Sequence, residues 1–297
     1  MKVTLIVIGG PTASGKTQVA ANLARHLGTE VISADSRQFY AAMRIGTARP
    51  FEEELLGVPH HFLGHLAIEE TWSAGTFARE AEPVLQRILA EHGVAIMVGG
   101  SGLYMDALIK GLDPLPAGDP ELRAELQAAL KKEGLPPLLA RLMKLDPDTH
   151  ARIDRRNPHR VIRALEVCMA TGRPYSEQRT APTDRTDARI IRIAMDQPRE
   201  ELYARINARV DRMMTNGLLD EVRDLLPFRA SNALRTVGYS ELFRHLDGEL
   251  SLDEAVALIK QHTRNYAKRQ LTWLRRDAHW KPSPPGDVEA IVALIDR

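Results

Sequence analysis

The chain has 297 residues, and its 40 Lys and Arg against 39 Asp and Glu leave a formal net charge of +1. Apolar residues make up 44% and charged residues 27%, which is typical of a globular protein and excludes a disordered tail, a collagen-like fibre and a disulfide-stapled mini-protein. The near-zero net charge excludes nucleic-acid binding through bulk charge, but it does not exclude local basic patches.

The cysteine content and the N-terminus bear on the compartment. The single cysteine, Cys168, rules out an intrachain disulfide and favours a reducing cytoplasm. The apolar run Val3–Ile8 is too short to span a bilayer and no cleavable small-residue site follows it, so we expect no membrane association. A monomer is favoured because the sequence shows no obvious interface stripe.

The first 110 residues alternate between strand and helix patterns. The β-branched run Val3–Ile8 ends in glycines and predicts a buried parallel strand. Further strands are expected at Glu30–Ala34 and Val94–Val98, and helices at about Lys16–His26, stopped by Gly28, and Phe77–His92, closed by Gly93. This alternation predicts right-handed crossovers and an α/β fold with a parallel sheet flanked by helices.

The composition of the sequence changes after the third expected strand. Nine of the 18 prolines fall between Pro114 and Pro182, separated by helical segments such as Glu121–Glu133 and Asn157–Thr171. We expect residues 116–185 to form a helical insertion domain, and residues 1–115 with 186–297 to form the core. The chain returns to the sheet at Arg189–Met195, and helices are expected at about Pro198–Asn216, Gly217–Leu226 and Leu252–Arg276.

A phosphate-binding motif follows the first strand. Gly10-Pro11-Thr12-Ala13-Ser14-Gly15-Lys16-Thr17 matches G-x-x-x-x-G-K-[ST] and lies between a strand and a helix, where the motif requires it, rather than in a chance glycine turn. Backbone N–H groups of the loop cradle phosphate oxygens, Lys16 adds a charge, and the Thr17 hydroxyl is a ligand for Mg²⁺. The motif predicts a diphosphate or triphosphate with magnesium, and it leaves open which bond is broken.

Two further candidates follow the second and third strands. The carboxyl ends of parallel strands meet at one edge of a sheet, so Asp35 and Ser101 are expected near the phosphate site. Asp35 could hold Mg²⁺ through water or accept a proton, or it could be a solvated turn or N-cap residue. Ser101 offers a hydroxyl between two glycines, or it is a polar turn residue. The segment Gly46–Pro50 is a phosphate-like or loop signal, and a weak one by itself.

Basic residues gather in two segments. The segment Arg152–Arg163 holds five arginines against Asp154, and Lys260–Trp280 holds six basic residues against Asp277. The second is part of an amphipathic helix on which Val256, Ile259, Thr263, Tyr266, Gln270 and Trp273 should face inward. Lys260, Arg264, Lys268 and Arg275 should gather on the opposite face. The two patches are either solvated faces or the footprint of a nucleic-acid phosphate backbone.

These blocks together resemble the tRNA dimethylallyltransferases, also called tRNA isopentenyltransferases. The resemblance covers nearly the whole chain through Gly10–Thr17, Asp35–Tyr40, Gly46–Pro50, Gly99–Tyr104, Asn157–Glu166, Gly238-Tyr239 and Thr263–Trp273. It implies a P-loop NTPase-like core with a helical insertion. It also implies a reaction in which the N6 amine of the adenosine 3′ to the anticodon attacks dimethylallyl diphosphate, so that diphosphate leaves and a C–O bond is broken.

The resemblance also implies roles for individual residues. Asp35 would accept the amine proton, and Ser101 would donate to a diphosphate oxygen or help place the amine. Lys16, Mg²⁺ on Thr17 and Arg235 would stabilise the departing diphosphate. The residues implied in contacting the tRNA anticodon stem-loop are Asp35, Ser36, Arg37, Gln38, Ser101, Arg123, His159, Arg160, Val161, Ile162 and Arg163, with Arg264 and Lys268 from the basic helix. The chain departs from the family's commoner residues at Ser101, usually Thr, and at Arg49, usually Lys.

Two other functions stay open at this point. A small-molecule or nucleotide kinase would bind ATP on the same loop and use an arginine-rich lid, for which 116–185 could be mistaken. The second alternative is a non-catalytic nucleotide switch or RNA-binding module. The N-K-x-D and D-x-x-G pair of motifs expected of a GTPase switch is, however, absent from the sequence.

Overall fold

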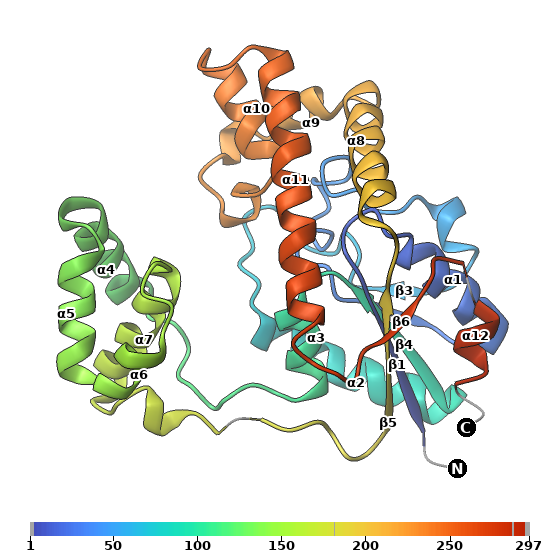
Figure 1. Ribbon diagram of the computed structural model, residues 1–297, viewed down its shortest axis with the longest axis horizontal. Helices are drawn as coiled ribbons and strands as arrows, with labels where there is room; N and C mark the ends of the chain where they lie inside the picture. Colours follow the sequence, from blue (N-terminus) through green and yellow to red (C-terminus); the bar gives the residue numbers. More distant parts are fainter. Residues whose placement is uncertain (1–2, 181, 287, 295–297) are drawn as a thin grey trace. The chain divides into compact units, whose positions relative to one another are not determined.

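A computed structural model describes residues 3–180, 182–286 and 288–294. They form two compact units, divided between Ile109 and Lys110 and again between Asp184 and Arg185. The first unit therefore combines two stretches that are distant in the sequence, and it contains all the named strands (Figure 1).

A six-stranded parallel sheet organises the first unit. Its strands are β1 (Thr4–Gly9), β2 (Val31–Ser33), β3 (His60–His61), β4 (Val94–Gly99), β5 (Arg189–Met195) and β6 (Lys281–Ser283). They lie in the order β3-β2-β4-β1-β5-β6, and every pair is parallel. The predicted α/β architecture is confirmed, with β1 in the middle of the sheet and the phosphate motif at its carboxyl end.

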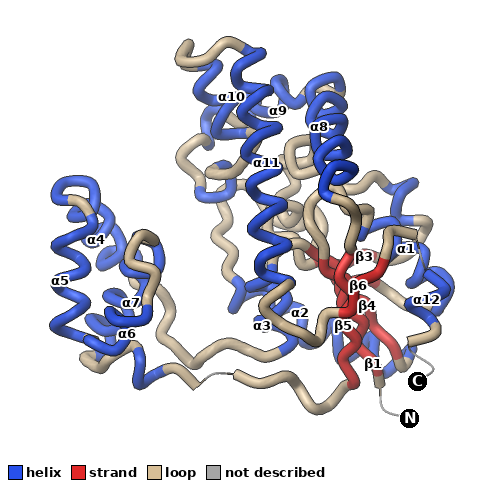
Figure 2. The backbone as a smooth tube through the Cα atoms, viewed as in Figure 1, coloured by secondary structure: helices blue, strands red, loops and turns tan. Residues whose placement is uncertain are grey.

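Alternate residues of β1 enter two separate hydrophobic cores. Leu5 and Val7 face one core, Ile6 and Ile8 face the other, and all four are 0% exposed. Burial of each side chain contributes about 1.5–3 kcal/mol, because both faces of the sheet are removed from water. The core around Ile6 contains residues of α1 (Lys16–Leu27) and α12 (Val288–Val292), whereas α2 (Ala74–His92) and α3 (Gly102–Ile109) contribute to the other. Figure 2 shows the strands enclosed between these helices.

Four helices of the first unit extend beyond the carboxyl ends of the strands. They are α8 (Arg199–Thr215), α9 (Leu218–Asp224), α10 (Tyr239–Leu246) and α11 (Leu252–Leu274). Short 3-10 turns at Leu226–Phe228 and Asn232–Leu234 lie between α9 and α10, and a further one, Glu52–Leu55, lies between β2 and β3 in the chain. The longest, α11, packs against α8 and α10 and reaches α3 with its C-terminal part (Figure 1). Its N-terminus is fixed by a capping box in which Ser251 and Glu254 satisfy each other's backbone N–H groups.

The second unit is entirely helical in its regular structure. It contains α4 (Pro120–Glu133), α5 (Leu135–Leu145), α6 (Pro147–Arg152), α7 (Pro158–Thr171) and a 3-10 turn at Ser176–Gln178. The helices enclose a small core of their own that includes Leu126, Leu142 and Leu165. Proline stands in the first turn of each α-helix, where its missing N–H costs nothing, which accounts for the proline-rich composition of this stretch.

The expected helices and strands are present with ends shifted by a few residues, but the sequence patterns missed several short elements. The strand β3 is two polar residues long, and β6 carries a proline at an edge of the sheet, so neither shows a strand pattern. Helices α3, α10 and α12 were also not anticipated. None of the helices in the described ranges has both the length and the apolarity needed to cross a bilayer.

Candidate active site

The phosphate loop forms a tight turn between β1 and α1. Ala13 and Gly15 have φ angles of 65° and 85°, and such left-handed residues turn successive N–H groups toward one side of the loop. Gly10 leaves no room for a side chain, since a Cβ there would lie 2.6 Å from the Ser14 hydroxyl. That hydroxyl is buried and has no hydrogen-bond partner among the described residues. A buried hydroxyl left unpaired is costly, so it suits a ligand oxygen.

A small pocket lies beside the loop at the start of α1. Lys16, Thr17, Ser33 and Asp35 contribute to its walls. Burial lowers the pKa of Lys16 to about 8, and the neighbouring carboxylate of Asp35 opposes this shift. Hydroxyl and carboxylate oxygens are the ligands that Mg²⁺ prefers, so the donor set of this pocket fits a magnesium ion.

A cavity of about 570 Å³ opens next to this pocket. Its lining includes Thr12, Asp35, Arg37, Arg209, Arg235 and Tyr266. Asp35 is in the lining of both spaces, and its Oδ1 accepts a hydrogen bond from the backbone N–H of Arg37 at 3.3 Å. The volume is sufficient for an organic ligand of moderate size.

Ser101 lies against the segment that carries Asp35. Its Oγ accepts a hydrogen bond from the backbone N–H of Ser36 at 3.0 Å and donates one to the Ser36 hydroxyl at 3.1 Å. Tyr266 interacts with the Ser101 side chain, and its pKa is raised by burial and by the nearby carboxylate of Asp35. Tyr266 is also among the residues that line the large cavity.

The side chains of Arg37 and Gln38 hold neighbouring loops. Arg37 donates to the carbonyl oxygens of Asn232 and Ala233, both at 3.0 Å. Gln38 donates to the carbonyl oxygens of Thr47 and Ala48 at 3.1 and 3.0 Å. The structure therefore gives these two candidates loop contacts within the protein, in addition to Arg37's place on the cavity wall.

Two arginines near the phosphate loop were not anticipated from the sequence. Arg209 of α8 donates to the Thr12 hydroxyl at 3.4 Å, and Arg205, one turn earlier, has a terminal nitrogen 3.3 Å from where a Cβ on Gly15 would lie. Burial lowers the pKa of Arg209, and the positive charges of Arg212 and Arg205 add to this effect. The i, i+4 spacing of Arg205 and Arg209 was the available signal. Arg235, the arginine singled out from the sequence, is exposed and lines the large cavity.

The weak loop signal at Gly46–Pro50 corresponds to a rigid wall of the cavity. The carboxylate of Glu221 accepts backbone N–H bonds from Arg44, Ile45 and Gly46 at 2.7–2.9 Å and a bond from the Tyr239 hydroxyl at 2.6 Å. A Cβ on Gly46 would lie 2.6 Å from the Tyr239 ring, so only glycine fits. Nothing in the sequence pattern linked Glu221 to this loop, which lies 175 residues away.

The candidate tRNA-contacting residues of the second unit divide into two groups. His159 and Arg160 are exposed at the start of α7, whereas Val161 and Ile162 are buried in the core of the unit. The other two are arginines that share one carboxylate: Arg123 and Arg163 contact Glu166 at 2.7 and 3.1 Å, and the Glu166 side chain is 1% exposed.

The basic stripe expected on α11 is interrupted. Lys260 pairs with Asp211 of α8 at 2.6 Å, and Arg264 donates to Asn207 of the same helix at 2.7 Å. These two side chains therefore face α8, because that helix covers part of the surface expected to be open to solvent. Lys268 and Arg275 are exposed, as expected.

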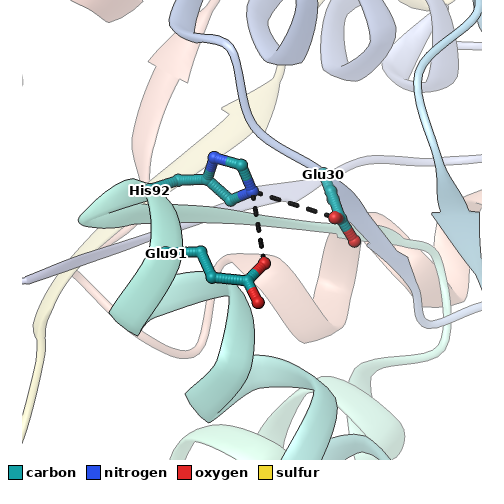
Figure 3. Close-up of side chains that lie close together, drawn as sticks. All are labelled: Glu30, Glu91 and His92. Atoms are coloured by element: carbon teal, nitrogen blue, oxygen red, sulfur yellow. Dashed lines mark ion pairs between the residues drawn. The ribbon is translucent and has the colours of Figure 1, made fainter.

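A cluster of Glu30, Glu91 and His92 lies at the C-terminal end of α2 (Figure 3). Its ligand atoms lie within 4.8 Å of one another. However, the guanidinium of Arg87 donates to both carboxylate oxygens of Glu30, at 3.1 and 2.6 Å, and to one carboxylate oxygen of Glu91, at 2.7 Å. Together with His61, Arg87 holds the pKa of Glu30 at about 2, so the cluster is an ion-pair network with its own cation.

Comparisons with known proteins agree with one another. The family model described as IPP transferase matches residues 38–277. A curated tRNA dimethylallyltransferase of Cytophaga hutchinsonii is 47% identical over 98% of this chain and 96% of its own length. Another from Bacteroides thetaiotaomicron is 47% identical over 92% of this chain and 89% of its own.

Solved structures show the same likeness. The full-length tRNA isopentenylpyrophosphate transferase of Bacillus halodurans superposes with a TM-score of 0.73 at 37% identity, covering 99% of this chain and 96% of that one. A eukaryotic dimethylallyltransferase described as acting on tRNA gives a TM-score of 0.82 at 25% identity, covering 97% of this chain and 75% of that one.

Proposed function

This chain belongs to the IPP transferase family, and on that premise we propose that it transfers the dimethylallyl group of dimethylallyl diphosphate to tRNA. The acceptor in this proposal is the N6 amine of the adenosine next to the anticodon on its 3′ side, and diphosphate is released. The names of the relatives favour this reaction over a kinase that uses the same phosphate loop.

The observation that carries the proposal is the position of Asp35. This residue lines both the pocket of Lys16 and Thr17 and the large cavity. A diphosphate bound at the loop and a purine lodged in the cavity would therefore meet near this group. Bond formation between N6 and the allylic carbon, breakage of the C–O bond and transfer of the amine proton to Asp35 would then take place close to this residue.

The phosphate loop would hold the leaving group. The Ser14 hydroxyl, unpaired among the described residues, and the Lys16 ammonium, which lies 3.5 Å from the Pro11 carbonyl oxygen, would bind the anion, and Arg209 adds a second positive charge beside Thr12. Preorganised donors of this kind stabilise charge that grows in the transition state. Thr17 would hold Mg²⁺, with Asp35 close enough to assist, and the ion would supply further neutralisation of the diphosphate.

Asp35 and Ser101 would act on the acceptor side. The carboxylate takes the amine proton, a contribution of roughly 10²–10⁴-fold. Ser101 is oriented by Ser36 and Tyr266 and places or polarises a bound group through its hydroxyl. Adenosines of an anticodon loop are unpaired, which lowers the cost of moving the base into the cavity.

The pH dependence of diphosphate binding follows from Lys16. Its pKa of about 8 in the free protein means that the ammonium loses its proton as the pH rises through 8. The affinity for dimethylallyl diphosphate should therefore be constant below pH 7 and fall by up to about tenfold per pH unit above 8, since one proton is taken up on binding. Titration of binding between pH 6 and 10 measures this slope. The variant Lys16→Arg should flatten it, and an unchanged slope in that variant would exclude Lys16 as its origin.

The exposed basic residues of α11 would contact the tRNA backbone. Replacing Lys268 by Ala should weaken tRNA binding more at low than at high salt and lower the slope of log K against log salt by about 0.7–1, because one phosphate contact is lost. Binding titrations at several salt concentrations test this, with the charge-conserving Lys268→Arg as the matched control. A salt-independent loss would indicate a packing defect instead.

The decisive experiment measures prenyl transfer. The protein is incubated with Mg²⁺, radiolabelled dimethylallyl diphosphate and tRNA from a strain that lacks the modification. Label should enter the RNA at a single adenosine. Phosphoryl transfer from ATP in the absence of RNA, without labelling of tRNA, would instead support the kinase.

We further propose that the protein works as a monomer in the cytoplasm. The single, buried cysteine is in keeping with that reducing compartment.

A further inference from the structure

The buried side chain of Gln270 joins two loops of the candidate site. Its Oε1 accepts a hydrogen bond from the backbone N–H of Thr12 at 2.8 Å, and its Nε2 donates one to the carbonyl oxygen of Gly100 at 2.9 Å. The side chain comes from α11, and the two loops lie 258 and 170 residues away in the sequence. One amide thus connects the phosphate loop with the loop that carries Ser101.

The loop around Ser101 is shaped to receive α11. A Cβ on Gly100 would collide with the Gln270 amide, and a Cβ on Gly102 would collide with the Trp273 ring. The two glycines that flank Ser101 therefore allow the helix to lie directly against the loop backbone. Tyr266, one turn before Gln270 on the same face, reaches Ser101 itself.

An amide is the side chain that matches both partners. The Thr12 N–H requires an acceptor and the Gly100 carbonyl requires a donor; both residues are half-buried, and Gln270 is 6% exposed. A carboxylate at this position would face the Gly100 oxygen with a second acceptor, and an aliphatic side chain would leave two half-buried backbone groups without this partner. The contact commits the Thr12 N–H to Gln270, and the Ser14 N–H donates to the Pro11 carbonyl oxygen at 3.2 Å, so both N–H groups already have partners within the protein.

We propose that Gln270 is a positioning residue that fixes the distance between the leaving-group loop and the loop of Ser101. The proposal rests on the proposed prenyl transfer, in which the diphosphate and the amine must lie on opposite sides of one carbon. Displacement of reacting groups by about 1 Å can cost on the order of 10²-fold in rate. Gln270 therefore acts on the chemical step without touching either substrate.

The test compares Gln270→Met and Gln270→Glu with Gln261→Met, an exposed glutamine of the same helix. Both Gln270 variants should lower kcat by about 10–100-fold, with KM for each substrate changed by less than about 3-fold, measured well below the melting temperature of each variant. Gln261→Met should match the wild type. In a Ser101→Ala background, Gln270→Met should cost less than about 3-fold, because the loop it positions has already lost its hydroxyl. Equal factors in both backgrounds, or an unchanged kcat, would overturn the proposal.

Amide hydrogen exchange tests the anchoring without any assay of activity. Gln270→Met should speed exchange in the segments 10–17 and 99–104, whereas Gln261→Met should not. Unchanged protection in both segments would overturn the inference even if prenyl transfer were absent. Faster exchange in Gln270→Met, together with a wild-type protein that labels no tRNA, would support the anchoring and refute the proposed function instead.

Discussion

Replacing Lys16 by Ala should reduce kcat/KM for dimethylallyl diphosphate by roughly 10²–10³-fold and leave tRNA affinity within about 3-fold of the wild type. The lost ammonium belongs to the pocket beside the phosphate loop, where it would face the departing diphosphate. Removal of one preorganised donor from a site of developing charge costs about 3–4 kcal/mol. Steady-state kinetics and separate binding titrations for the two substrates measure the two effects.

Stability provides a second readout for the same variant. Burial lowers the pKa of Lys16, which shows that the folded protein holds this charge at a cost. Lys16→Ala should therefore keep or raise the melting temperature while activity falls. Lys281→Ala, at an exposed lysine of the same unit, is the control and should change neither quantity. Equal losses of affinity for the diphosphate and for tRNA would contradict the role given to Lys16.

Replacing Asp35 by Asn should lower kcat by about 10²–10⁴-fold, because the amide keeps the size of the side chain but cannot accept the amine proton. Binding of tRNA should change little. The carboxylate of Asp35 also raises the pKa of Lys16, so its loss makes Lys16 easier to deprotonate. KM for dimethylallyl diphosphate is therefore measured alongside kcat, at pH 7 and below, where this secondary effect is smallest.

Asp224→Asn is the matched control for this variant. Asp224 is an exposed aspartate at the end of α9, away from the two pockets that Asp35 lines, and its replacement should leave kcat unchanged. A fall in kcat of less than about 3-fold in Asp35→Asn, with tRNA binding intact, would remove Asp35 from the reaction. The geometry would then support a binding role for this residue.

Local sequence patterns were sufficient for the elements that bear the site. The phosphate loop, the strand before it and the helix after it are encoded within Val3–Gly28, since a glycine turn and a regular apolar run specify their conformations over short range. The placement of Asp35 near this loop also followed from sequence, because parallel strands end at the same edge of the sheet. The Ser101 hydroxyl contacts Ser36, and Ser101 is not among the residues that line either pocket.

Contacts between distant segments were not encoded in this way. Arg209 beside Thr12, Glu221 beneath Gly46 and Gln270 between the two loops each join residues more than 165 positions apart. Each is a polar residue on a helix, and even where spacing offers a signal, as for Arg205 and Arg209, its sequence neighbourhood does not identify its partner. The interruption of the basic stripe by α8 has the same origin, since the sequence gives the face of a helix but not the element that covers it.

The sequence by itself thus determined the family, the sheet and the position of the phosphate-binding motif, because these depend on motifs and on short-range backbone preferences. Only the tertiary structure decided which helices close the cavity, which arginine reaches the phosphate loop and which side chain holds the two loops together. Those features arise when α8, α9 and α11 pack over the carboxyl ends of the strands, and packing of that kind depends on surfaces formed by residues from the whole chain.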